Sequence, residues 1–227
     1  MALPKDIQWV TFDVYGTLID WETGVYEAFQ AEAKRSGFDV GDKNRLIELF
    51  LKHQAVIKSG SYELYAEVLR RVAMKVAEDL EWDLEPSRTN FLPDSVIRWK
   101  PFREANAALD RIAKKYQVGL VVNIDDKLLV ASRRHIRSDF DIVVTAQQVR
   151  SYKPEAAHFT ECARRIGGKK GWVHVGSSYY YDIEPSLKAK LPTIWVNRKG
   201  EKLPDPKAKK PDLMVKNLRD VANALKA

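Results

Sequence analysis

The sequence of 227 residues has a single cysteine and four histidines, and no apolar run is long enough to span a bilayer. A lone cysteine, Cys162, excludes an intramolecular disulfide and a metal site built from several cysteines; we expect a buried, unreactive thiol on a helix. The histidines show no metal-ligand spacing: His53, His135, His158 and His174. The N-terminal residues lack the apolar core of a signal peptide, so we expect a soluble cytoplasmic protein with no membrane partner.

The sequence also has fewer acidic than basic residues: 31 aspartates and glutamates against 38 lysines and arginines, which gives a formal charge of +7. Part of this excess lies in the proline-containing stretch 198–211. Nucleic-acid binding is typical of basic residues interleaved with aromatic ones, and this stretch has no aromatic residue. We therefore expect a solvated loop and no nucleic-acid partner, although a positive field would attract a small anionic substrate.

Short β-type runs alternate with helical patterns along most of the chain. The expected strands are mostly continuous apolar runs, as in strands covered on both faces: Ile7–Phe12, Val118–Val122, Ile142–Thr145, Trp172–Val175 and Thr193–Val196. The expected helices that follow them are Phe102–Lys115, Asp126–Arg137, Glu155–Ile166, Asp182–Lys190 and Asn217–Lys226. This alternation predicts an α/β fold with a parallel, doubly wound sheet.

Strands are lacking between about Trp21 and Asp94, where the expected helices are Tyr26–Ser36, Lys43–Ser59 and Ser61–Leu80. We interpret this stretch as a helical insert that forms a second, smaller domain over the strand ends. The predicted α/β core domain is then 1–18 with 95–227, and the predicted helical domain is 19–94. An alternative is that the helices only cover an edge of the sheet. Their apolar faces are compatible with a homodimer.

Polar residues follow the ends of the expected strands, which is where open α/β sheets bind their ligands. These residues are Asp13, Tyr15 and Thr17 after the first strand, Asn123 after the second, Lys153 beyond the third, and Ser177, Tyr179 and Asp182 after the fourth. Taken singly, Asp182 also fits a helix N-cap and Lys153 a solvated loop. Their joint placement on one rim of one sheet predicts a site in which Asp13 acts as a nucleophile.

Four motifs in this order resemble the haloacid dehalogenase superfamily and, within it, the L-specific 2-haloacid dehalogenases. The motifs are Phe-Asp-Val-Tyr-Gly-Thr-Leu at 12–18, Val122-Asn123, Ser151-Tyr152-Lys153-Pro154, and Gly176-Ser177-Ser178 through Asp182. The first motif is specific, and the others gain weight from their order. The resemblance runs the whole length of the chain and implies a Rossmann-like core with an inserted helical cap that closes over the site.

Two positions favour carbon–halogen over phosphate-ester chemistry. Phosphatases of this superfamily place a second acid two residues after the nucleophile, where this chain has Tyr15, and a phenol with a pKa of about 10 is a poor substitute. They also continue the fourth strand with Gly-Asp, where this chain has Gly176-Ser177, so two carboxylates for a divalent cation are missing. A halide leaves without a proton, and a 2-haloacid carries no phosphate dianion. We therefore expect no metal and no other cofactor.

The expected enzyme is a hydrolase that cleaves the carbon–halogen bond of a small 2-haloacid. Asp13 would displace the halide from C2, and water would then hydrolyse the resulting aspartyl ester to give a 2-hydroxy acid of inverted configuration. The alternatives are a phosphatase of the same fold, a catalytically weak, hydrolase-like protein of unknown substrate, and a non-enzymatic protein that uses the fold only for binding. Retention of Asp13, Lys153 and Asp182 together counts against the last of these.

The resemblance also implies roles for the matching residues. Lys153 would hold Asp13 ionised, and Asp182 would position or deprotonate the hydrolytic water. Thr17 and Ser177 would donate hydrogen bonds to the carboxylates of Asp13 or of the substrate. The implied substrate-binding residues are Tyr15 as a pocket wall, Asn123 near the departing halide, and Tyr179.

Some positions depart from the pattern of these dehalogenases. Val122 replaces a serine that contacts the substrate carboxylate, and Phe159 stands where a tyrosine hydroxyl is expected. Tyr179 replaces an asparagine, and the run 179–181 either narrows the pocket or packs against a helix. The arginine that cradles halide and substrate in the cap of these dehalogenases has no clear match in this sequence. The nearest cation is Lys52, which the helical phase can also turn toward solvent. These changes predict a different or larger substrate, or a slow dehalogenase.

Overall fold

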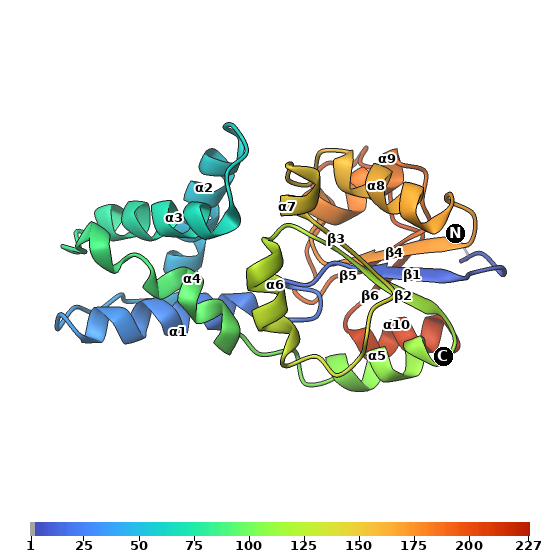
Figure 1. Cartoon of the computed structure of the whole chain (residues 1–227), viewed down its shortest axis with the longest axis horizontal. Coiled ribbons are helices and arrows are strands. Elements are labelled where there is room, and N and C mark those ends of the chain that lie inside the picture. Colours follow the sequence, from blue (N-terminus) through green and yellow to red (C-terminus); the bar gives the residue numbers. More distant parts are fainter. Residues whose placement is uncertain (1–2) are drawn as a thin grey trace. The chain divides into compact units, whose positions relative to one another are not determined.

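The computed structural model describes residues 3–227, and the chain divides into two compact units (Figure 1). The α/β unit contains the residues up to Ile19 together with Pro101–Asn123 and His135–Ala227. The helical unit contains Asp20–Lys100 and Ile124–Arg134. The predicted boundaries instead assign 95–100 and 124–134 to the α/β core and Ile19 to the helical domain.

The α/β unit is built on a six-stranded parallel sheet with the order β3-β2-β1-β4-β5-β6. The strands are β1 Trp9–Phe12, β2 Gln117–Val122, β3 Ile142–Thr145, β4 Trp172–Gly176, β5 Thr193–Val196 and β6 Leu213–Val215. The sheet confirms the predicted fold class. The edge strand β6 is not among the predicted strands, because an apolar run of only three residues is too short to indicate one; the structure leaves these residues half-buried or exposed.

Helices cover both faces of this sheet, as a doubly wound fold requires (Figure 1). Helices α7, α8 and α9 lie on one face, and α5 and α10 lie on the other. Their bounds are α5 Ala105–Ala113, α7 Ala146–Val149, α8 Ala157–Ile166, α9 Glu184–Lys188 and α10 Leu218–Ala224. The helix expected over Asp182–Lys190 is instead a π-helical turn, Tyr179–Ile183, that leads directly into α9.

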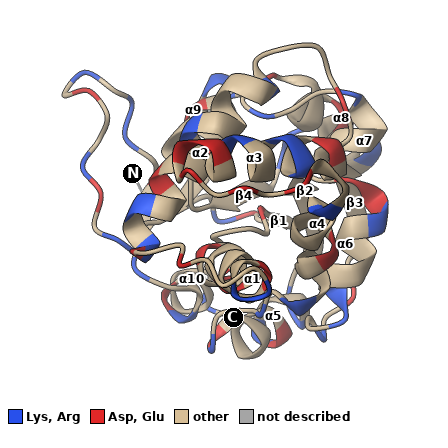
Figure 2. Cartoon of the chain, turned by 90° about the vertical axis from the view of Figure 1, so that its left-hand side faces the viewer, with Lys and Arg blue, Asp and Glu red and all other residues tan. Residues whose placement is uncertain are grey.

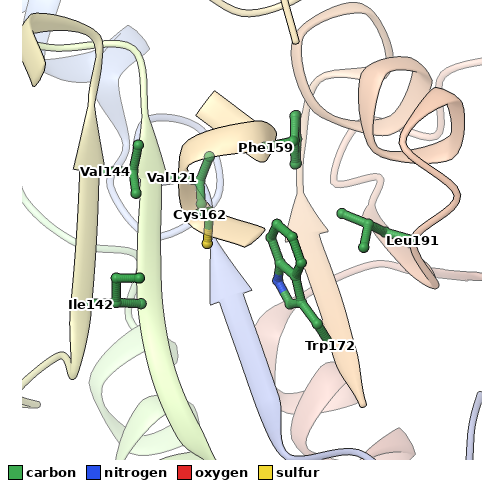
Figure 3. Close-up of a cluster of buried hydrophobic side chains, with 7 residues drawn as sticks. All are labelled: Val121, Ile142, Val144, Phe159, Cys162, Trp172 and Leu191. Carbon is green, nitrogen blue, oxygen red and sulfur yellow. The ribbon is translucent and has the colours of Figure 1, made fainter. Parts of the chain in front are cut away.

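A buried apolar cluster joins α8 to the sheet (Figure 3). Its members are Val121, Ile142, Val144, Phe159, Cys162, Trp172 and Leu191. Burial raises the pKa of the Cys162 thiol to about 12, so this thiol is protonated and unreactive at neutral pH, as expected. Phe159 is also part of the cluster, so the ring that stands in place of a tyrosine serves as a core residue here.

The helical unit contains no strand within its described residues. Its helices are α1 Trp21–Lys34, α2 Lys43–Lys58, α3 Tyr65–Asp79, α4 Phe91–Ser95 and α6 Asp126–Arg133, with single 3₁₀ turns at Pro86–Arg88 and Val96–Arg98. Asp20 and Asp42 begin α1 and α2 by accepting hydrogen bonds from backbone N–H groups in the first turn of each helix. No helix among residues 3–227 has both the length and the apolar character needed to cross a membrane.

Asp125 connects the second segment of the helical unit to the first. Its Oδ1 accepts a hydrogen bond of 2.7 Å from the backbone N–H of Tyr65, and its Oδ2 accepts one of 2.8 Å from Ala66. These are N–H groups of the first turn of α3, which has no side-chain cap of its own. An aspartate from a remote segment therefore caps α3, and α6 is anchored in the helical unit.

Candidate active site

Asp13 lies directly beyond β1, the strand that pairs with both β2 and β4. Its backbone N–H continues the ladder by donating to the carbonyl of Val175, 2.9 Å away. The chain then turns back at once, helped by Gly16, whose φ of +94° favours glycine. This turn brings the Thr17 hydroxyl to 3.0 Å from Asp13 Oδ2, to which it donates. The carboxylate is buried, with 7% of the residue exposed.

Lys153 connects Asp13 to Asp182 through three hydrogen bonds of one ammonium group. Its Nζ lies 2.9 Å from Asp13 Oδ1, 2.6 Å from Asp182 Oδ1 and 2.8 Å from the carbonyl of Val121. An ammonium has three donors, so all of them are engaged. Both Lys153 and Asp182 are only 1% exposed. The structure thus assembles three residues that are far apart in the sequence into a buried cluster, which we call the Asp13–Lys153–Asp182 cluster.

The two carboxylates of this cluster differ in acidity. Burial and the neighbouring charge of Asp182 raise the pKa of Asp13 to about 6, against the opposing effects of Lys153 and Thr17. For Asp182, burial acts in the same direction, but the Lys153 ammonium and the nearby His174 imidazole together outweigh it and hold the pKa of Asp182 well below its usual range. Burial disfavours the charged form of Lys153, yet both carboxylates together raise the pKa of its ammonium. Lys153 therefore stays charged, Asp182 stays ionised, and Asp13 titrates just below neutrality.

The backbone around the cluster is fixed by side-chain amides and by a turn. Asn123 accepts from the backbone N–H of Lys153 at 2.7 Å and donates to its carbonyl at 3.1 Å, so its amide holds the Lys153 backbone on both sides. The backbone N–H of Ser178 donates to Asp182 Oδ2 at 3.1 Å. A Cβ on Gly176 would lie 2.3 Å from that of Asp182, so only glycine lets the two residues approach in this way.

The structure places three other predicted residues near the strand ends with different partners. Tyr15 forms a β-bridge with Ile19 in the loop after β1. Ser177 follows β4, and its carbonyl accepts from the Trp195 indole at 2.9 Å. Tyr179 donates its hydroxyl to the carbonyl of Lys209 at 2.8 Å, and its ring meets Trp195 edge-on. The Tyr179 hydroxyl is thus engaged by the 198–211 stretch, which weakens its assignment to substrate binding.

Among residues 3–227, no three side chains of histidine, cysteine, aspartate or glutamate gather in a way that could hold a metal ion. The family model for haloacid dehalogenase-like hydrolases matches residues 7–189, which include every residue of the cluster. The chain belongs to the haloacid dehalogenase-like hydrolases.

Among characterised members of this hydrolase family, an (S)-2-haloacid dehalogenase of Pseudomonas fluorescens is 25% identical, with 97% of each chain covered. The fold is shared with a defluorinating L-2-haloacid dehalogenase at a TM-score of 0.83 and 19% identity, over 100% of this chain and 99% of that one. It is also shared with the L-2-haloacid dehalogenase of Xanthobacter autotrophicus carrying covalently bound chloropropionic acid, at a TM-score of 0.82 and 18% identity over 97% and 99% of the chains.

One functional candidate of this hydrolase was missed by sequence reasoning. Arg198, expected in a solvated loop, is only partly exposed and donates to the carbonyls of Gly16 and Thr17 at 3.2 and 2.8 Å. Its guanidinium also pairs with Glu104 at 2.7 Å and lies 3.6 Å from the centre of the Phe102 ring. Arg198 therefore fixes the loop that delivers Thr17 to Asp13. The only sequence signal was its position two residues after β5, at the same rim as the other strand ends.

The cation considered as a substitute for the cap arginine has a different role in the structure. Lys52 has 61% of its side chain exposed and pairs with Asp79 across helices α2 and α3, at 2.9 Å. Figure 2 shows charges of both signs on these two helices. The structure thus turns Lys52 toward solvent, which is the alternative that helical phase allowed.

Proposed function

We propose that this hydrolase cleaves the carbon–halogen bond of a small 2-haloacid through a covalent ester on Asp13. The observation that carries the proposal is the Asp13–Lys153–Asp182 cluster combined with Tyr15 two residues after the nucleophile. The cluster supplies a buried carboxylate, a permanent cation and a second carboxylate. It offers no acid at the position where a phosphatase protonates its leaving group.

In the first step, a carboxylate oxygen of Asp13 attacks C2 of the substrate from the side opposite the halogen. The carbon–oxygen bond forms as the carbon–halogen bond breaks, and the bonding pair leaves with the halide, so no proton is needed. Asp13 becomes a neutral ester in this step, and the Lys153 ammonium offsets the negative charge of the buried cluster while the bonds change. Asn123 would face the departing halide, and its amide also keeps the Lys153 backbone in place.

In the second step, water attacks the side-chain carbonyl carbon of the Asp13 ester. Asp182 accepts a proton from that water, and the substrate oxygen leaves with a proton as the alcohol of a 2-hydroxy acid. Thr17 and Ser177 would donate to the carboxylates of Asp13 or of the substrate, and Tyr15 would form a wall of the pocket. A covalently bound chloropropionic acid in the Xanthobacter relative supports the ester intermediate. The helical unit would act as the cap over this site.

A halide-release assay tests the proposal. The purified protein is given both enantiomers of 2-chloropropionate and fluoro-, chloro- and bromoacetate, with and without a chelator, and an aryl phosphate with magnesium serves as the comparison. We expect halide release that the chelator leaves unchanged, and inversion at C2. Magnesium-dependent phosphate release without halide release would instead establish the phosphatase alternative, and turnover of neither class would favour a protein that only binds its ligand.

A single turnover in ¹⁸O-labelled water tests the covalent step. Hydrolysis at the side-chain carbonyl places the heavy oxygen in Asp13 first, and the product of the first turnover contains the original Asp13 oxygen. Mass spectrometry of the peptide that contains Asp13 measures the label. A labelled first-turnover product with unlabelled Asp13 would mean that water attacks C2 directly.

A further inference from the structure

His174 is a buried, titratable residue beneath the candidate site, and no step of the proposed reaction uses it. It lies on β4, fully buried, and the parallel register pairs it with Thr11 on β1. Its ring stands edge-on to Phe159, with 5.0 Å between the centroids. Its Nε2 lies 3.9 Å from Asp182 Oδ1. The imidazole therefore separates the apolar cluster under the sheet from the charged cluster at its rim.

A chain of hydrogen bonds reaches the other nitrogen of this ring. The indole Nε1 of Trp172 donates to Thr11 Oγ1 at 2.7 Å, and Thr11 Oγ1 lies 2.9 Å from His174 Nδ1. An indole N–H only donates, so Thr11 uses its oxygen as the acceptor in the first contact. Its own hydroxyl hydrogen then has Nδ1 as its acceptor within the described chain. This arrangement uses each donor and acceptor once.

This arrangement corresponds to one tautomer. Where Nδ1 accepts the Thr11 hydrogen, the ring hydrogen of a neutral imidazole resides on Nε2, whereas the opposite tautomer requires Thr11 Oγ1 to accept from both Trp172 and His174. Burial lowers the pKa of His174, and the nearby Lys153 ammonium acts in the same direction, against the opposing effect of Asp182. Nε2 has no hydrogen-bond partner in the part of the chain that the structure describes, and a buried N–H without an acceptor is costly. The nearby anion able to accept it is Asp182.

We propose that His174 is a positioning residue for Asp182. Its Nε2–H is held toward the Asp182 carboxylate by the Trp172–Thr11 relay and fixes that carboxylate during hydrolysis of the Asp13 ester. This inference rests on the proposed function. Esterification removes the charge of Asp13, so Asp182 is then the one carboxylate that pairs with Lys153. With Asp13 esterified, the Nε2–H, which is 3.9 Å from Asp182 Oδ1 in this structure, then moves within hydrogen-bond distance of that oxygen. This second donor limits rotation of the Asp182 carboxylate at the step where it must hold and deprotonate water.

The tautomer is tested first, in the full-length protein and without substrate. Proton–nitrogen NMR of ¹⁵N-labelled histidine is expected to show His174 with hydrogen on Nε2 and a titration midpoint below the ordinary value of 6.5. Thr11→Val removes the relay hydroxyl and should shift His174 toward a mixture of tautomers. Hydrogen on Nδ1 in the wild-type protein would overturn the proposal, as would a tautomer that Thr11→Val leaves unchanged.

Two variants then separate positioning from packing. Glutamine can place an amide N–H near the position of Nε2, whereas phenylalanine keeps a ring but has no donor. His174→Phe should slow ester hydrolysis about tenfold, the loss of one hydrogen bond to a charged group, so that the Asp13 ester accumulates in quenched samples. The rate of ester formation and kcat/KM, which reports only the steps up to ester formation, should stay within about twofold of wild type, and KM should fall together with kcat. His174→Gln should restore most of the hydrolysis rate.

The positioning role would be overturned if His174→Phe and His174→Gln both hydrolysed the ester at the wild-type rate. It would also be overturned if both variants lost the same fraction of the hydrolysis rate in parallel with a fall in Tm. A further readout does not depend on haloacid turnover: the ¹³C shift of the Asp182 carboxyl should report a higher pKa in His174→Phe than in His174→Gln or wild type. If wild type forms no ester with any haloacid, the proposed function fails. The carboxyl shift and the tautomer then still decide whether His174 positions Asp182.

Discussion

Two lysine–aspartate ion pairs of this protein have the same nitrogen–oxygen distance, but the pKa of the aspartate is raised in one pair and lowered in the other. Lys153 Nζ lies 2.9 Å from Asp13 in the α/β unit, and Lys52 Nζ lies 2.9 Å from Asp79 in the helical unit. The lysine side chain is 1% exposed in the first pair and 61% exposed in the second. The pKa of Asp13 is raised to about 6, whereas hydrogen bonds from Lys52 and His53 lower the pKa of Asp79.

The two aspartates differ in pKa because their surroundings differ, since the lysine–aspartate distance is the same in both pairs. Asp79 still has 31% of its side chain exposed and accepts from two donors, so its ionised form is favoured. Asp13 loses its hydration and shares one cation with a second carboxylate, Asp182, so its ionised form is disfavoured despite an equally short contact. Such an arrangement stabilises the fold little, and it leaves the Asp13 carboxyl mostly ionised at pH 7, just above its pKa of about 6.

Replacement of Lys153, the buried cation, should have the largest effect on stability and activity. Lys153→Met leaves two buried carboxylates without their partner, which typically destabilises a protein by about 3–5 kcal/mol. This corresponds to a fall in Tm of roughly 6–20 °C for a chain of this size, together with loss of halide release. Calorimetry at pH 7 measures it, and Lys52→Met, whose charge is solvated, is the matched control with little change. Equal shifts in the two variants would contradict the contrast between the pairs.

Replacement of Asp13, the proposed nucleophile, should separate activity from stability. Asp13→Asn removes the attacking oxygen and should lower halide release by about 10⁴-fold or more. Because the fold disfavours ionised Asp13, its Tm at pH 7 should equal or exceed that of wild type. Asp79→Asn should instead lower Tm slightly, because the fold favours that charge. A clear loss of stability in Asp13→Asn would show that the fold favours the Asp13 charge.

The dependence on pH sharpens the same point. Asp13 must be ionised to attack, so kcat/KM should fall below about pH 6 as Asp13 takes up its proton, a limb that belongs to the coupled pair with Asp182. Thr17→Val removes a donor that favours the charge and should move this limb to higher pH. A limb near the ordinary value of 3.8 would contradict the raised pKa.

The raised pKa of Asp13 also determines the direction in which its contribution to stability changes with pH. The folded pKa of Asp13 lies above its ordinary value of 3.8, so its contribution to stability is present at low pH and is lost as pH rises through about 6. Asp182, with a lowered pKa, acts in the opposite sense, and its contribution is lost on acidification below the ordinary range of a carboxyl group. Asp13→Asn should abolish the first dependence and keep the second.

The smallest expected effect is at Arg198. Arg198→Lys keeps a positive charge but loses the planar group that reaches the carbonyls of Gly16 and Thr17 and stacks on Phe102. We expect kcat to fall about tenfold, the effect of one weakened charge-assisted hydrogen bond at the Thr17 loop, with a small change in Tm. Lys202→Met, on the same exposed loop, is the control and should keep wild-type kcat.

The sheet could be predicted because its central strands are continuous apolar runs that need no distant partner to be recognised. The placement of Asp13, Lys153 and Asp182 at one rim follows from that sheet. Arg198 could not be predicted, because its function depends on two backbone carbonyls some 180 residues earlier in the chain. The assignment of 124–134 to the helical unit depends likewise on Asp125 meeting α3, a contact that no local pattern encodes.

That contact at Asp125 limits how the helical unit can be exchanged between relatives. The unit is assembled from two separate stretches of chain, and the shorter one supplies the carboxylate that caps α3 in the longer one. A chimaera that transplants only 20–100 would import a helix whose first N–H groups depend on an acid supplied by its host. Exchange of the helical unit therefore requires two coordinated grafts, with Asp125 carried in the second.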